Sequence, residues 1–377
     1  MNAMNPKLFE KLNFKKELHP KFLYLKETPS LINQKVQLEK WFEGFEDRDN
    51  KIVKEFQTTY HSAFWEIYLY RVFKEMGYEI DFSHAMPDFI LKSRPTNILV
   101  EATTANIKKG GVNEDTRNES NFLNLFVPPM LQPNFDYELK EAITRYGSSI
   151  WDKKKKYNDT YKNRDWVSPD NPYVIALSSY AQVDYGRDYI YGILALLFGL
   201  YFVPEQNDFI SKESILKNGT NKELPLGIFL DESYAEVSAI IFSTTTTIGK
   251  LDATVCSNNS SYTDNLVFNL YRDFNDEVEP YKRTLITPES PEALTDGLFV
   301  FHNPMAKAPI SLETFYASGI TQYYIDVNGT FGRIGNPNPT VARMSFPKQF
   351  AYRFIPPIEQ NVQNYNFYAR NYLNSYL

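Results

Sequence analysis

The sequence predicts an α/β protein in which a mixed central sheet is flanked by helices, with additional α and β elements toward the C-terminus. Two observations predict this class. Between residues 51 and 202, segments of helical and of strand character follow one another in the order helix–β–β–β–helix–β–helix. The run Pro172–Ser178 is short, continuous and apolar, which is typical of a strand buried at the centre of a sheet.

The individual elements follow from periodicity, caps and turn residues. Ser30 is a candidate cap for the first helix, and Gly77 is positioned to end the second helix as its C′ residue. The tetrad Arg94–Asn97 (Arg-Pro-Thr-Asn) suits a tight connection between two strands. These signals predict helices at 31–45, 51–76, 135–157, 188–202 and 358–377, and strands at 78–82, 88–93, 98–105, 172–178, 237–242 and 297–301.

No internal repeat and no clear linker divides the chain. We expect an N-terminal helical segment at 1–48, an α/β core at 49–260 and a C-terminal extension at 261–377 that packs on the core. The chain has 377 residues, of which 43% are hydrophobic and 16% aromatic. It therefore has enough apolar material for a large core that is rich in aromatic side chains.

Composition and the N-terminal segment predict a soluble, cytoplasmic protein without a membrane partner. The single cysteine, Cys256, excludes an intramolecular disulfide and favours a reducing compartment. Residues 1–20 lack the apolar stretch of a secretory signal. The longest apolar run, Tyr189–Val203, has 15 residues, fewer than the roughly 20 that a membrane-spanning helix needs.

The overall charge counts against a nucleic-acid partner without excluding one. The formal net charge is −6 at pH 7, whereas phosphate-binding domains are usually basic. Local basic patches can still attract a polyanion, and the candidates are Lys153–Lys156 and the pair Lys108–Lys109. Aromatic residues interleave with lysines and Arg164 around the first patch, a mixture that suits base stacking as well as core packing. These aromatic residues are Trp151, Tyr157, Tyr161 and Trp166.

Glu66 is an unusual residue for its position in the second predicted helix. The positions three, four and seven residues away are largely apolar. They are Thr59, Ser62, Ala63, Leu69, Tyr70 and Phe73. A carboxylate in such a stripe is costly unless it is paired, protonated or bound to a cation. Pairing with Arg71 would be a purely structural explanation.

The two predicted strands add two further carboxylates. Because side chains alternate along a strand, Glu101 and Thr103 share one face. If Arg94–Asn97 is the connecting loop, Asp88 lies opposite Thr103 and diagonal to Glu101, roughly 7–8 Å apart at Cα. A shift of the register by two residues would keep Asp88 and Glu101 on one face, whereas a shift by one residue would separate them.

Converging carboxylates with room for water suit Mg²⁺ or Mn²⁺. Mg²⁺ typically binds through one or two carboxylates and retains several waters. Such an ion can lower the pKa of a bound water and offset charge that develops on a phosphate. The pattern therefore indicates metal-assisted hydrolysis of a phosphodiester.

A helix that carries a glutamate, a Pro-Asp strand and a strand that ends in Glu-Ala-Thr together resemble the PD-(D/E)XK, or restriction-endonuclease-like, nuclease superfamily. The segments that carry the resemblance are Phe64–Glu66, Pro87–Phe89 and Leu99–Thr103. The resemblance implies that Glu66, Asp88 and Glu101 line a divalent-metal site. It also implies a restriction-endonuclease-like core, which the helix ending in Lys-Lys-Lys-Lys-Tyr and the strand Pro172–Ser178 would complete.

One position departs from the family pattern. The family's lysine lies two residues after the motif glutamate, and this chain has Thr103 there. The resemblance gives that lysine the task of orienting the attacking water and stabilising charge, whereas a threonine hydroxyl supplies a hydrogen bond without charge. Lys153 and Lys156 are candidates for a lysine that reaches the site from another element, and Lys92 is a third.

The resemblance implies a Mg²⁺- or Mn²⁺-dependent DNA endonuclease in which Asp88 and Glu101 bind the metal. Glu66 would complete the site directly or through water, and Thr103 would help to position that water. DNA is the expected partner, and the chain could form a homodimer. One alternative is a catalytically degenerate member of the same fold that binds nucleic acid or a protein. Another is an unrelated α/β protein in which the three carboxylates do not meet.

Overall fold

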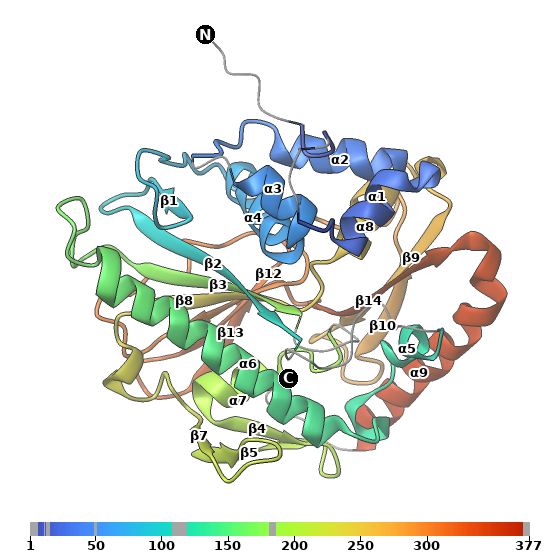
Figure 1. Ribbon diagram of the computed structural model, residues 1–377. Helices are drawn as coiled ribbons and strands as arrows, with labels where there is room; N and C mark the ends of the chain where they lie inside the picture. Colours follow the sequence, from blue (N-terminus) through green and yellow to red (C-terminus); the bar gives the residue numbers. More distant parts are fainter. Residues whose placement is uncertain are drawn as a thin grey trace.

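The computed structural model describes residues 7–10, 12, 16–48, 51–107, 119–180 and 186–371. Within these residues, seven strands form one mixed sheet in the order β1-β2-β3-β8-β11-β12-β13 (Figure 1). Their bounds are Phe89–Leu91 (β1), Ile98–Asn106 (β2), Tyr173–Tyr180 (β3), Ala239–Ser243 (β8), Leu298–His302 (β11), Ile320–Ile325 (β12) and Phe331–Gly335 (β13). Strands β2, β3 and β8 are parallel to one another, and β1 is antiparallel to β2. The predicted mixed α/β architecture is confirmed.

Helices cover both faces of this sheet (Figure 1). One face carries α2 (Ile32–Phe42), α3 (Ile52–Thr58) and α4 (His61–Glu75), with α1 (Pro20–Glu27) beside them. The other face carries α6 (Phe135–Lys156) and α7 (Tyr191–Phe198). The remaining helices are α5 (Glu119–Asn124), α8 (Ile248–Asn258) and α9 (Ala351–Asn371).

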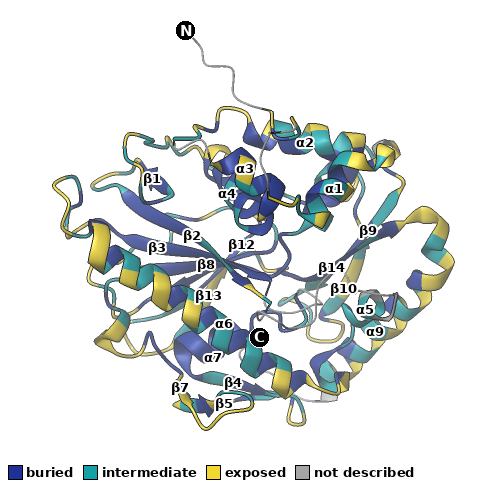
Figure 2. Ribbon diagram, in the orientation of Figure 1, coloured by how far each residue is buried: buried dark blue, intermediate teal, exposed yellow. Residues whose placement is uncertain are grey.

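The alternation of side chains along β2 divides the interior into two cores. Val100 and Ala102 pack toward the α4 face, and Leu99 and Ala105 pack toward the α6 face. Glu101 therefore points toward α6. Figure 2 shows that the central strands are buried, whereas the outer surface of α6 is exposed.

Smaller sheets complete the chain. The second sheet has the order β10-β9-β14, and the antiparallel pairs β4–β5 and β6–β7 each form a separate two-stranded sheet. The bounds are Leu200–Val203 (β4), Asp208–Ser211 (β5), Ser214–Leu216 (β6), Glu223–Pro225 (β7), Asn265–Arg272 (β9), Tyr281–Leu285 (β10) and Thr340–Pro347 (β14). The central sheet crosses the boundary expected at residue 260, because β11, β12 and β13 all lie beyond it.

The long helix predicted at 51–76 is two helices, α3 and α4. Tyr60 lies between them with a φ of 45°, which an α-helix does not accommodate. Its buried ring packs between Phe56, at 5.3 Å, and Phe64, at 5.4 Å. Burial of the Tyr60 ring therefore contributes more to stability than a continuous helix through this position would. Gly77 follows α4 with a φ of 85°, as predicted for a C′ residue.

Three other boundaries differ from the prediction. The helix predicted at 188–202 ends at Phe198, because Gly199 adopts a left-handed conformation and the chain continues as β4. The strand predicted at 78–82 is reduced to one bridge between Ile80 and Leu91. The C-terminal helix α9 begins at Ala351, earlier than predicted. The basic pair Lys108–Lys109 lies outside the described residues.

Among the described residues, no helix combines the length and the apolar character that crossing a bilayer requires.

A buried carboxyl group lies between α6 and α7. Asp188 is 1% exposed, and its Oδ2 accepts a hydrogen bond from the hydroxyl of Tyr146, whose oxygen also lies 2.7 Å from Ser179 Oγ. Among the described residues, Asp188 Oδ1 has no hydrogen-bond partner. Burial raises the pKa of Asp188 to about 7, because the charged form loses hydration that Tyr146 replaces only in part.

We predict that Asp188 makes the folded state less stable as the pH rises. Its folded-state pKa lies above its unfolded value, so the contribution is full below about pH 4 and is lost as the pH rises through 7. Between these two pH values, the free energy of unfolding should fall by up to about 1.4 kcal/mol per pH unit. Urea unfolding at several pH values measures it. Asp188→Asn should flatten the slope, whereas Asp165→Asn, which changes an exposed carboxylate, should leave it unchanged.

Candidate functional site

Strands β1 and β2 bring Asp88 next to Glu101. Leu91 pairs with Ile98, where the sequence prediction paired Ser93 with Ile98, so the observed register differs by two residues. A shift of two residues preserves the face of each side chain. Continuing the observed register by one residue places Asp88 opposite Glu101 instead of diagonal to it.

Asp88 is held by backbone contacts on both sides. Its Oδ2 accepts a hydrogen bond of 2.7 Å from the backbone N–H of Ala102. The Asp88 carboxylate thereby accepts the backbone hydrogen bond of β2 at a position that β1 does not reach. The guanidinium of Arg48 donates to the carbonyl oxygens of Asp88, at 2.9 Å, and Pro87, at 3.2 Å, and also to that of His84. These bonds fix the segment that carries the carboxylate.

Glu101 is fully buried and is neutralised by two lysines from α6. Its Oε1 lies 2.9 Å from Nζ of Lys153 and also contacts Nζ of Lys156. Its Oε2 accepts a hydrogen bond of 3.2 Å from the hydroxyl of Tyr161. Both lysines hypothesised to reach the carboxylates from this helix therefore do so.

The phase of α6 explains why these two lysines reach the sheet. Leu139, Ile143, Tyr146 and Ile150 are buried on one face of the helix. Continuing by three or four residues leads to Lys153 and Lys156, so both follow the buried stripe. Their side chains are 20% and 37% exposed, which places the ammonium groups at the boundary between core and solvent.

The neighbouring lysines, Lys154 and Lys155, have other partners. Lys155 pairs with Asp159 one helical turn away, and both side chains are more than half exposed. Lys154 donates to the carbonyl of Ser233 and lies 4.4 Å above the ring of Tyr234. The basic run therefore divides into two residues at Glu101 and two on the surface.

Glu66 lies on α4, which packs on the face of the sheet opposite α6, yet it is close enough to interact electrostatically with Asp88 and Glu101. It is half-buried. Burial, followed by the nearby carboxylates of Asp88 and Glu55, raises its pKa well above the usual value, while Lys153 acts in the opposite direction. Arg71, its alternative structural partner, lies 4.0 Å from Glu75 instead. Glu66 is thus electrostatically coupled to the Asp88–Glu101 pair.

The electrostatics at Asp88 and Lys153 show an excess of negative charge. Burial and the carboxylate of Glu101 raise the pKa of Asp88 to about 6, although Lys153 and Lys156 partly offset this. Burial would lower the pKa of Lys153, but Glu101 and Asp88 outweigh it and the pKa is raised. Lys153 therefore stays charged at neutral pH, and the three carboxylates have capacity for further positive charge.

Thr103 and Lys92 complete the account of the predicted residues. Thr103 lies on β2 two residues after Glu101, on the same face, and is half-buried. Lys92 pairs with Glu79, and both side chains are about half exposed or more. Lys92 therefore pairs with Glu79 at the surface, and the structure does not support it as the lysine that replaces the one missing at Thr103.

Two residues of this region were not identified as site residues from the sequence. Tyr161 reaches Glu101 because residues 157–161 form one π-helical turn after α6, which rotates the chain back toward the sheet. Arg48 comes from the segment after α2, 40 residues before Asp88. No local pattern connects either residue to the strands, so only the folded chain shows the contacts.

Asp88 and Glu101 are the carboxylates best placed to share a divalent cation. The described part of the chain contains no group of three or more His, Cys, Asp and Glu side chains arranged to hold a metal ion. Mg²⁺ needs only one or two carboxylates because it retains waters. Since Lys153 and Lys156 engage Glu101, a cation would have to displace at least one ammonium group. The candidate donor set is therefore two carboxylates, of which Glu101 is engaged by the lysines of α6.

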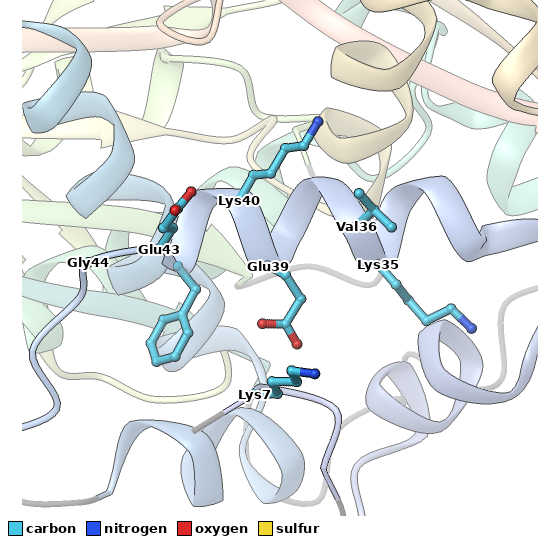
Figure 3. Close-up of a pocket in the computed structure, with 8 residues that line it drawn as sticks. Lys7, Lys35, Val36, Glu39, Lys40, Glu43 and Gly44 are labelled. Carbon is cyan, nitrogen blue, oxygen red and sulfur yellow. The ribbon is translucent and has the colours of Figure 1, made fainter. Parts of the chain in front are cut away.

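A surface groove of about 520 Å³ lies along α2 and shares no residue with this site (Figure 3). Figure 3 shows that the carboxylate of Glu39 faces Lys7, while Lys35 and Lys40 extend away from each other. The lining mixes charges of both signs and contains no constellation for catalysis. It consists of Lys7, Lys35, Val36, Glu39, Lys40, Phe42, Glu43 and Gly44.

No family model, no curated protein and no solved structure matches this chain. A functional assignment therefore rests on the residues and their geometry.

Proposed function

We propose that this chain is a Mg²⁺- or Mn²⁺-dependent endonuclease that hydrolyses phosphodiester bonds in DNA on a restriction-endonuclease-like core. The order of elements supports the proposal. Helix α4 carries Glu66, Asp88 directly precedes β1, Glu101 lies on β2 antiparallel to β1, and α6 then leads into β3, parallel to β2. The resemblance implies this order.

The observation that carries the proposal is the contact between Lys153 and Glu101. The sequence lacks a lysine at Thr103, and α6 supplies an ammonium group 2.9 Å from the motif carboxylate. A charged lysine beside carboxylates suits the stabilisation of a phosphate that gains negative charge. Under this proposal, Lys153 takes over the role that the resemblance gives to a lysine at position 103.

The residues would divide the chemistry as follows. A cation held by Asp88 and Glu101 would lower the pKa of a water and offset charge on the phosphate. Glu66 would complete the site directly or through a water, and the hydroxyl of Thr103 would help to orient the attacking water. Lys153 would donate to that water or to the scissile phosphate, and Lys156 would bind a neighbouring phosphate oxygen.

We predict that Lys153→Ala reduces Mn²⁺-dependent cleavage of plasmid or single-stranded DNA by about a hundredfold, because one charged donor at the transition state is lost. Conversion of supercoiled plasmid, with Mn²⁺ or Mg²⁺, measures this effect. Lys154→Ala is the matched control, because that lysine is adjacent on α6 but contacts Ser233 and Tyr234. Equal activity of the two variants would remove Lys153 from the mechanism.

The engagement of Glu101 by two lysines also favours a second candidate function. Lysines that neutralise the motif carboxylate can replace a cation structurally, as in a degenerate member of the fold that only binds nucleic acid. Purified protein that binds DNA but leaves DNA and RNA intact with Mg²⁺, Mn²⁺ or Co²⁺ would support this candidate. Metal-dependent cleavage that is lost in Lys153→Ala would support the nuclease.

A further inference from the structure

Three aromatic rings form a continuous stack beside the candidate site. The rings of His84 and Trp166 have centroids 4.2 Å apart and planes inclined by 14°. The rings of Trp166 and Tyr161 follow at 6.3 Å and 8°. The three rings, called the ring stack below, are nearly parallel. Tyr161 and Trp166 come from the π-helical turn after α6 and the loop that follows it, and His84 comes from the segment before β1.

The ring stack is joined to the site at both ends. At one end, the hydroxyl of Tyr161 donates to Glu101 at 3.2 Å. At the other end, Arg48 binds the carbonyl oxygens of both His84 and Asp88. The stack is therefore connected to Glu101 through the Tyr161 side chain and to the segment of Asp88 through the backbone of His84.

The stack changes from buried to accessible along its length. Tyr161 is fully buried, whereas Trp166 and His84 are only partly buried. Among the described residues, the ring contacts continue no further than His84. Cations border the same region, with Arg164 exposed two residues before Trp166 and Lys156 partly exposed at Glu101. Accessible rings beside cations suit a strand whose bases and phosphates are both bound.

We infer that the substrate strand is unpaired at this site and that one of its bases stacks on the accessible His84 end of the ring stack. This inference rests on the proposed function, because it assigns the substrate of the same site. Bases inside a duplex already stack on one another, so a ring can take up only a base that is unpaired or flipped out. The site would thus select single-stranded or locally opened DNA.

A purely structural role is the competing explanation, because the stack also joins the loop before β1 to the loop before β3. The two roles differ in their dependence on the base. A structural contact affects binding of any polyanion, whereas stacking affects only strands that carry a base.

The test measures binding of the full chain in EDTA, where no cleavage occurs, by fluorescence anisotropy. The probe is a labelled oligothymidylate of about twelve nucleotides, within the usual site size for single strands. It is compared with a strand of abasic sites and a duplex of equal length. We expect about tenfold weaker binding of the oligothymidylate by His84→Ala and no change for the abasic strand. His84→Phe, which keeps a ring, should restore binding.

Trp151→Ala provides the control, because Trp151 is 51% exposed on α6 and lies outside the stack. Equal affinity of the wild-type chain for thymidylate and abasic strands would overturn the inference, as would tighter binding of the duplex or no binding at all. Affinity for an oligouridylate tests whether ribose is accepted as well. Plasmid cleavage with Mn²⁺ tests the proposed nuclease activity separately. Cleavage without base-dependent binding would refute the base stacking but not the nuclease.

Discussion

Glu101→Gln is expected to abolish metal-dependent DNA cleavage while the chain remains folded. The substitution keeps the shape of a fully buried side chain and its hydrogen bond from Tyr161 but removes the charge that would hold a cation. Loss of that electrostatic contribution corresponds to a decrease on the order of a thousandfold, or about 4 kcal/mol in the activation barrier. Plasmid cleavage at saturating Mn²⁺ measures it, with circular dichroism as the check on folding.

Glu236→Gln is the matched control for this substitution. Glu236 also contacts two lysines, Lys162 at 3.6 Å and Lys307 at 3.5 Å, but it lies away from β1 and β2. Its replacement should leave cleavage unchanged. If both glutamine variants cleave as the wild type does, Glu101 is a structural counterion for the lysines of α6 and the proposed nuclease is refuted.

Glu292→Ala is expected to destabilise the folded chain by about 3–5 kcal/mol, because it leaves two buried cations without their carboxylate partner. The side chains of Glu292 and Lys250 are each 1% exposed and that of Arg343 is 3% exposed. Asn269 completes the cluster with a hydrogen bond of 2.7 Å to Glu292 Oε2. Burial would raise the pKa of Glu292, but Arg343 and Lys250 hold it below its usual value. Urea unfolding measures the loss.

This buried cluster joins the two sheets. Arg343 lies on β14, Asn269 on β9, and the Arg343 guanidinium also donates to the carbonyl of Thr245, just after β8. Removing Glu292 should therefore loosen the second sheet from the central one. Glu279→Ala is the comparison, because Glu279 pairs with Arg370 on the surface, where ion pairs contribute about 0–1 kcal/mol. Similar losses for the two variants would contradict the role given to burial.

The candidate site illustrates how far pattern reasoning extends. Alternation along β2 correctly places Glu101 and Thr103 on one face, and this conclusion survives a register that differs by two residues. Helical phase likewise places Lys153 and Lys156 together, because residues three apart share a face. Both deductions use only local backbone geometry, which sequence spacing determines directly.

The contacts between these elements required the folded chain. Lys153 and Glu101 are 52 residues apart, and their contact depends on how α6 crosses the sheet and where it ends. Tyr161 reaches Glu101 only because a π-helical turn follows α6. Arg48 reaches the Asp88 segment only because the chain after α2 lies next to that segment. Glu292 stands in a stretch with two prolines, Pro288 and Pro291, and it is buried against Lys250 and Arg343, which are distant along the chain.

The sequence by itself determined the α/β class, the order of the main elements and the faces that Glu66, Asp88 and Glu101 share with their neighbours. These properties depend on periods of two and 3.6 residues, which the backbone imposes over short distances. Only the tertiary structure decided that Lys153, which comes from α6, contacts Glu101 on β2. Long-range packing and charge neutralisation in a buried site fix that contact, and neither leaves a pattern along the chain.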